Sequence, residues 1–91
     1  MKIKFLESSA RDIDWMRRYY RSVFVEGSKN AQKQYLSATK ALSMNPNIGH
    51  PSERVDGARE YHIPRTPFTF VYRVKDETIE VLRLLDGRSS E

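Results

Sequence analysis

The stretch FTFVYRVKDETIEVLRLL, residues 68–85, decides the fold class of this chain. Over residues 68–75, aromatic and aliphatic side chains alternate with a second, mostly polar set, which is the period of a half-buried strand. A short charged turn follows at 75–77, and residues 78–85 form a second, more apolar run. The stretch therefore predicts two antiparallel strands, with 78–85 central in the sheet. Strict alternation in the second strand gives two apolar faces, one with Ile79 and Val81 and the other with Leu82 and Leu84.

Shorter segments with the same two-residue period flank this pair of strands. Residues 58–63 predict a strand, and 64–67 form the turn that leads into the next one. Residues 45–57 are rich in Pro, Gly, Asn and Ser and predict a connecting loop. At the N-terminus, residues 2–6 alternate basic and apolar side chains and predict a further short strand.

Helical periodicity replaces the two-residue period in the N-terminal half. Ser9, followed three residues later by Asp12, resembles a capping box and predicts that a helix begins there. Gly27 ends this helix by supplying an easy left-handed conformation. The apolar face of the helix, at spacings of one, three or four, consists of Ile13, Met16, Tyr20, Val23 and Phe24.

A second helix is predicted from Ser28 or Asn30 to Asn45-Pro46, because a residue before proline avoids the helical region. Its apolar face consists of Ala31, Tyr35, Ala38 and Leu42. Two helices joined around Gly27 make an antiparallel hairpin. The order strand, two helices and three strands (β-α-α-β-β-β) predicts one α+β domain over residues 1–91, an antiparallel curved sheet with the N-terminal helical hairpin packed on one face.

Composition limits the setting in which this domain works. At 91 residues and 10.7 kDa there is room for one modest core, so marginal stability or stabilisation by a partner is expected. There is no Cys, which excludes disulfides and thiolate metal sites. We read no signal peptide and no membrane span in the sequence. We therefore expect a cytoplasmic protein without membrane attachment, metal or cofactor.

The net charge of +4 suits an acidic partner, but it is unevenly distributed. The excess of Lys and Arg lies in residues 1–50, whereas residues 51–91 carry one more acidic than basic side chain. Six of the seven basic residues in this second half are nevertheless arginine. Since the guanidinium fork suits fixed, bidentate contacts with phosphate or carboxylate, we expect these arginines to include a functional surface.

Five motifs, in order along the chain, carry a family resemblance. They are Ala10-x-Asp12-Ile13, Leu42-x-x-x-Pro46-x-x-Gly49, Gly57-x-Arg59, Pro67-Phe68-x-x-x-Tyr72-Arg73-Val74 and Ile79-x-Val81-Leu82-Arg83-Leu84-Leu85-Asp86-Gly87-Arg88. Together they resemble the RelE/ParE toxin superfamily, and its ParE branch most closely. The match extends over nearly the whole chain.

This resemblance implies the toxin of a type II toxin–antitoxin system, a class associated with growth arrest and plasmid stabilization. ParE-like members poison DNA gyrase, whereas RelE-like members are ribosome-dependent endoribonucleases that cleave messenger RNA. Both kinds are neutralised by a co-expressed antitoxin whose other end binds the operon's DNA. The resemblance thus implies a ParD-like antitoxin partner in a heterodimer or heterotetramer, gyrase as the target, and contact with DNA only through the antitoxin.

One position departs from the family pattern. ParE-like and several nuclease members carry His before the terminal Gly-Arg, where this chain has Asp86. An aspartate with the ordinary pKa of about 3.9 is ionised at neutral pH and is a poor proton donor. We therefore predict a gyrase-binding toxin without catalytic chemistry. Two alternatives are an inactive homologue that only binds antitoxin, and a RelE-like ribonuclease that uses Arg59, His62, Arg65, Arg83 and Asp86.

Nuclease chemistry needs a base, an acid and cations in one place. On an uninterrupted strand, Arg59 and His62 fall on opposite faces and would not cooperate. We expect structural roles for His62 and for His50 in the loop, and neither has the spacing of a metal site.

Two sets of residues are candidates for binding partners. Candidates for the toxic surface are Arg59, Arg65, Arg73, Arg83, Asp86 and Arg88. Candidates for antitoxin contact lie on the first helix, where Trp15 and Tyr19 are four residues apart beside the apolar stripe, and they are Arg11, Trp15, Arg18 and Tyr19.

Overall fold

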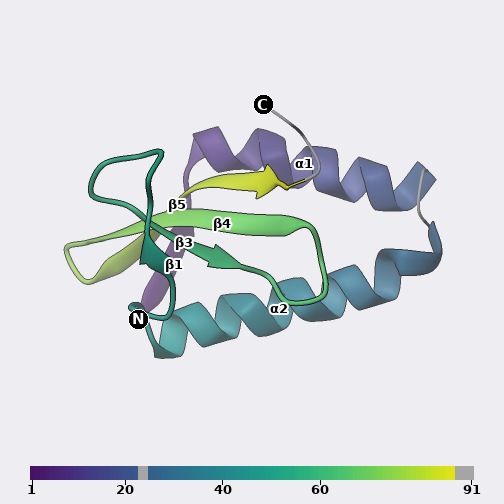
Figure 1. Cartoon of the computed structure of the whole chain (residues 1–91). Helices are drawn as coiled ribbons and strands as arrows, with labels where there is room; N and C mark the ends of the chain where they lie inside the picture. Colours follow the sequence, from purple (N-terminus) through teal and green to yellow (C-terminus); the bar gives the residue numbers. More distant parts are fainter. Residues whose placement is uncertain (23–24, 88–91) are drawn as a thin grey trace.

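Two long helices lie along a small twisted sheet in the computed structural model, which describes residues 1–22 and 25–87. The elements are β1 (Lys2–Phe5), α1 (Glu7–Ser22), the short 3-10 turn η1 (Val25–Gly27), α2 (Ser28–Met44), β2 (His50–Pro51), β3 (Arg59–His62), β4 (Phe68–Lys75) and β5 (Thr78–Asp86). The two helices run in opposite directions, with the strands between them in the view of Figure 1. Among the described residues, no helix is long and apolar enough to cross a membrane.

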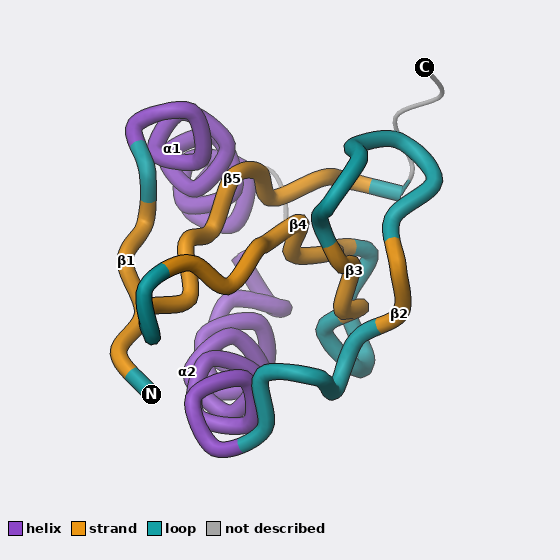
Figure 2. The backbone as a smooth tube through the Cα atoms, turned by 90° about the vertical axis from the view of Figure 1, so that its left-hand side faces the viewer, coloured by secondary structure: helices purple, strands orange, loops and turns teal. Residues whose placement is uncertain are grey.

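The sheet has the strand order β1-β5-β4-β3-β2, so the predicted α+β class is confirmed. It is mixed rather than wholly antiparallel, because β1 pairs with β5 in parallel, Lys2 opposite Thr78 and Phe5 opposite Val81. The helical hairpin between β1 and the other strands supplies the long connection that a parallel neighbour needs. A short strand not expected from the sequence, β2, pairs with β3 at the other edge. The middle strand of the five is β4 (Figure 2). The strand predicted to be central, β5, lies next to it and is paired with β1 on its other side.

A β-bulge alters the predicted faces of β5. Val71 pairs with Arg83, whereas its neighbour Tyr72 pairs with Val81, so Leu82 is an extra residue in the ladder. The alternation therefore resets, and Leu84 is buried on the same face as Val81 rather than opposite to it. The sequence prediction of two separate apolar faces was wrong here, because a bulge is invisible to a strict period of two.

The ends of the helices also differ from the prediction. α1 begins at Glu7, and the Ser9 hydroxyl donates to Leu6 O (2.8 Å) instead of capping the helix with Asp12. Gly27 has φ −87° and ψ −1°, so it is not left-handed; it is the N-cap residue of α2. The start of α2 at Ser28 and its end before Asn45 were predicted correctly. Val23 and Phe24 lie outside the described residues.

One hydrophobic core joins both helices to a single face of the sheet. Its helical members are those predicted from the periodicity, with Leu42 fully buried. Its strand members are Phe68, Phe70, Tyr72, Ile79, Val81 and Leu84, and Ile63, directly after β3, joins them. Tyr20 and Tyr35 bring the two helices to this face, since their rings lie 6.1 Å from Phe68 and 5.7 Å from Phe70 respectively. The predicted packing of the hairpin on one face is thus confirmed.

The turn between β4 and β5 carries backbone strain. Lys75 pairs with Thr78, which leaves a two-residue loop with φ 51° at Asp76 and 60° at Glu77. Positive φ at both positions is the type I′ turn that matches the twist of a hairpin, and its second position favours glycine.

Glu77→Gly is therefore expected to stabilise the protein by about 0.5–1 kcal/mol, because glycine adopts a positive φ without steric cost. The melting temperature should rise by roughly 4 °C in a thermal unfolding experiment. Thr78→Gly, one residue later in extended backbone, is the control and should lower it. A lower melting temperature for Glu77→Gly would contradict the assignment of the turn.

Candidate functional site

Arg83, a candidate for the toxic surface, holds α1 against β5. Its Nε and Nη2 donate to the two carboxylate oxygens of Asp12 at 2.7 and 3.1 Å, a bidentate pair. The backbone N–H of Leu84 donates to the same carboxylate (2.9 Å). The hydrogen bond to Asp12 also raises the pKa of the Arg83 guanidinium above its usual value. Asp12 was predicted to be part of a helix cap, but its carboxylate instead accepts hydrogen bonds from residues of the sheet.

A second arginine of this set is paired across the β4–β5 hairpin. Arg73 Nε donates to Glu80 Oε1 at 2.7 Å, and the two residues are cross-strand partners. This hydrogen bond lowers the pKa of the Glu80 carboxyl, with the nearby positive charges acting in the same direction. Arg73 is thus neutralised within the sheet.

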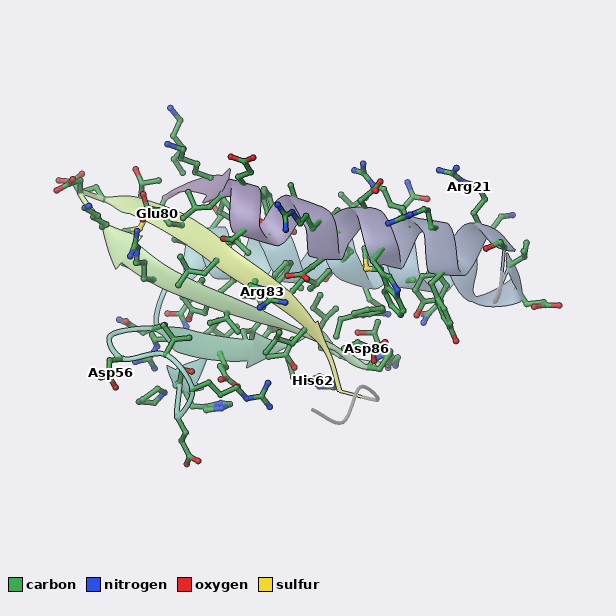
Figure 3. The ribbon with its side chains drawn as sticks, turned by 90° about the horizontal axis from the view of Figure 1, so that it is seen from above. Arg21, Asp56, His62, Glu80, Arg83 and Asp86 are labelled. Carbon is green, nitrogen blue, oxygen red and sulfur yellow. The ribbon has the colours of Figure 1, made fainter. Side chains whose placement is uncertain are left out.

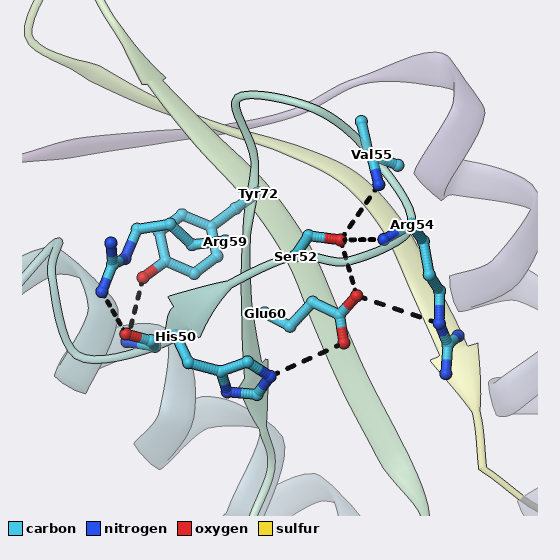
Figure 4. Close-up of polar contacts among 8 residues, drawn as sticks. His50, Ser52, Arg54, Val55, Arg59, Glu60 and Tyr72 are labelled. Carbon is cyan, nitrogen blue, oxygen red and sulfur yellow. Dashed lines mark hydrogen bonds and ion pairs between the residues drawn. The ribbon is translucent and has the colours of Figure 1, made fainter.

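Arg59 belongs to a network of hydrogen bonds that positions the loop after α2 (Figure 4). Its Nη2 donates to Asn47 O (3.2 Å) and to Gly49 O, while its buried Nε has no partner among the described residues. Beside it, Tyr72 donates to Pro46 O (2.7 Å) and accepts from Gly49 N (3.1 Å). Glycine is required at 49, because a Cβ there would collide with the backbone carbonyl of residue 60.

Glu60 organises the next part of the same loop. It is largely buried and accepts a hydrogen bond from the Ser52 hydroxyl at 2.7 Å. His50 Nε2 and Arg54 Nε approach its carboxylate to 3.9 Å from either side (Figure 4). The Ser52 hydroxyl also accepts from the backbone N–H groups of Arg54 and Val55, both at 3.1 Å. These polar residues fix the loop against the sheet.

His62 and Arg59 point to opposite faces of β3, as expected from the sequence. They are three residues apart, and the register from Arg59 opposite Tyr72 to His62 opposite Thr69 contains no bulge. The His62 ring hydrogen-bonds Thr66 O through Nε2 at 2.6 Å. Arg65 lies exposed in the turn between these strands. Arg88 is outside the described residues.

One surface hollow of about 740 Å³ brings candidates from both predicted sets together. It lies beside the end of β5 and is lined by Asp12, Trp15, Arg54, Phe68, Arg83, Leu84, Leu85 and Asp86. Figure 3 shows Arg83 and Asp86 along β5, with Arg21 at the far end of α1. Both basic side chains of this hollow face acidic partners of the same chain, so it offers little excess positive charge to an incoming phosphate.

Two of the predicted antitoxin-contact residues, Trp15 and Tyr19, form an aromatic pair on α1, called here the aromatic ledge. Trp15 and Tyr19 stack with ring centroids 5.4 Å apart, and Trp15 is 43% exposed. Arg18 lies beside them and pairs with Asp14 (3.5 Å). Arg11 instead lines a different hollow, next to Phe5.

A groove between the helices was not anticipated from the sequence. It encloses about 510 Å³ and is lined by Met16, Arg17, Tyr20, Arg21, Val25, Ser28, Ala31, Gln32, Tyr35 and Leu36. Leu36 and Val25 are each 59% exposed at its edge. Burial raises the pKa of the Tyr35 hydroxyl, opposed by the positive charge of Arg17. Leu36, an apolar residue off the predicted stripe of α2, was a signal in the sequence that could have indicated this groove.

The described residues contain no group of three His, Asp or Glu side chains that could hold a metal ion. The candidate features of this part of the chain are an apolar groove with a basic rim, an aromatic ledge and a charge-balanced hollow.

The architecture is that of a small toxin of a type II toxin–antitoxin system. A solved structure described as "Chromosomal ParDE TA system from P. aeruginosa" superposes with a TM-score of 0.73 and 31% sequence identity, over 92% of this chain and 92% of that chain. The family model of the ParE toxin of the type II toxin–antitoxin system parDE matches residues 3–90, and the chain belongs to this family. Comparison with curated proteins gave no match.

Asp12→Ala should lower the free energy of unfolding by roughly 2–3 kcal/mol, because it removes the bidentate pair with Arg83 and leaves Leu84 N–H without its acceptor. Asp14→Ala, two residues away on the same helix, is the control. It breaks only the exposed pair with Arg18 and should cost about 0.5 kcal/mol or less. Urea unfolding of both variants checks this, and equal losses would mean that the contact to β5 contributes little.

Proposed function

We propose that this chain is a ParE-like toxin that stops growth by binding DNA gyrase in the cytoplasm. We further propose that a cognate ParD-like antitoxin neutralises it in a heterodimer or heterotetramer. Membership in the ParE toxin family supports the general assignment. The observation that carries the choice of a binding mechanism is the state of the arginines, three of which are engaged within the protein.

A ribonuclease would need those same cations for the charge that develops on phosphorus. Arg83 is held by Asp12 and Arg73 by Glu80, while Arg59 donates to two backbone carbonyls. His62, the imidazole of the nuclease hypothesis, faces away from Arg59 and is bonded to the next turn. Releasing these groups for catalysis would cost the contacts that hold the helix and loops. The geometry thus favours a toxin that acts as a binding protein.

The groove between the helices is the surface that best fits the antitoxin. Its floor is apolar, with Met16, Tyr20 and Tyr35 from both helices. Its rim carries the guanidinium groups of Arg17 and Arg21, and none of the described residues that line it is acidic. An amphipathic antitoxin helix with acidic flanks would match this pattern, because apolar anchors fill such grooves and opposite charges guide the approach.

Purified protein is expected to inhibit supercoiling by gyrase or to trap cleaved DNA, and induced cells should form filaments with a DNA-damage response. The physical reason is that the protein presents binding surfaces rather than an assembled proton-transfer site. Supercoiling assays and ribosome-dependent mRNA cleavage assays should be run in parallel. Cleaved mRNA with gyrase unaffected would assign the chain to the ribonucleases.

Leu36→Glu should weaken neutralisation by the antitoxin about tenfold or more, because it places a charge at the apolar edge of the groove facing an acidic partner. Toxicity without antitoxin should remain. Met44→Glu is the matched control, since Met44 is also exposed on α2 but lies outside the groove lining. Titration of growth arrest against antitoxin expression measures both. If the two variants are neutralised equally well, the antitoxin docks elsewhere.

A further inference from the structure

A tight turn between β3 and β4 holds an arginine in a strained backbone conformation. Thr66 N donates to Ile63 O (3.3 Å), which makes Pro64 and Arg65 the two central residues of a β-turn. Arg65 has φ 63°, in the left-handed region that residues other than glycine rarely adopt. Because proline fixes a negative φ before it, the turn is of type II, and its third position favours Gly or Asn.

Hydrogen bonds from several directions hold this turn in place. The Thr66 hydroxyl donates within the turn (2.9 Å) and accepts from Phe68 N (3.1 Å). The His62 ring bonds Thr66 O at 2.6 Å, and the Asn30 amide donates from α2 to the carbonyl of Arg65 at 3.5 Å. A strained residue persists only where its surroundings over-determine its conformation, and such strain concentrates at functional sites.

The connection between the strands does not itself demand this strain. At residues 76–77 a two-residue hairpin imposes positive φ on whatever side chains stand there. A proline-containing turn can instead be of type I, in which no residue has a positive φ. The type of connection therefore does not by itself account for a residue other than glycine at position 65.

The side chain of Arg65 differs from those of the other described arginines in the predicted toxic surface. It is exposed, and within residues 1–22 and 25–87 its guanidinium has no hydrogen-bond or ion-pair partner. Arg59, Arg73 and Arg83 are all engaged inside the protein. Arg65 thus presents five N–H donors on a rigid turn.

We propose that Arg65 is the residue through which this toxin contacts an acidic group, a carboxylate, on its target protein. The inference rests on the proposed function and deepens it. A guanidinium on a pre-organised turn loses little conformational entropy when it forms a bidentate pair. A nucleic-acid phosphate is a poorer fit, because backbone binding needs several free cations in a row, whereas Arg73 and Arg83 of the sheet are paired with carboxylates.

The test compares Arg65→Gly, Arg65→Lys and Glu77→Gly for melting temperature, growth arrest, gyrase inhibition and neutralisation by antitoxin. Arg65→Gly should raise the melting temperature by roughly 4 °C and reduce toxicity about tenfold or more. Arg65→Lys keeps the backbone strain and the charge, so its melting temperature should not change, but toxicity should fall because the bidentate fork is lost. Glu77→Gly, the same relief of strain in another turn, should be stabilised and fully toxic.

Full toxicity of Arg65→Gly would overturn the inference, and so would a variant that escapes the antitoxin while remaining toxic. Binding of duplex DNA by the wild type, lost in Arg65→Gly and steeply salt-dependent, would assign the contact to phosphate and also overturn it. A toxic wild type that leaves gyrase unaffected, with Arg65→Gly detoxified, would overturn gyrase as the target but support the role of Arg65. A wild type that arrests no growth would overturn the proposed function and this inference together.

Discussion

The carboxylate of Asp12 is the contact on which much of this molecule depends. It accepts two hydrogen bonds from Arg83 and one from Leu84 N–H, which joins the first helix to the last strand. The Ser8 hydroxyl adds a further bond to Leu82 O (2.7 Å) beside it. Because charge-assisted bidentate bonds are directional, they set the position of α1 on the sheet as well as stabilising it. That position places Trp15 over Phe68 and opens the groove toward α2.

The preference for arginine over lysine in the second half of the chain is explained in large part by contacts within the protein. The guanidinium groups of Arg54, Arg73 and Arg83 pair with carboxylates. Arg59 donates to carbonyls in a loop that Tyr72 also holds. Forked donors suit such fixed geometry better than an ammonium group does. The core is thereby supplemented by polar contacts between β4 and β5, between α1 and β5, and within the loop after α2. In the proposed function, recognition falls to a few exposed features of the fold.

Two of those features lie on different parts of the fold. The groove belongs to the helical hairpin, and the Arg65 turn belongs to the sheet, tied to α2 by the amide of Asn30. Separate surfaces would let one partner silence the protein and another be its target. The proposed role of Arg65 sets stability against activity at this position, since the residue that would relieve the backbone strain lacks the guanidinium.

The sequence by itself determined the class of protein, the extent of β4 and of α2, and the helical part of the core, because these follow from periodicities within short segments. It could not reveal that Asp12 faces β5 or that β1 pairs in parallel with that strand. Nor could it place the bulge at Leu82, which moves Leu84 to the core face. Asp12 and Arg83 are 71 residues apart. Only the tertiary structure decides such contacts, since each depends on how whole elements dock, and a local pattern of side chains carries no record of its distant partner.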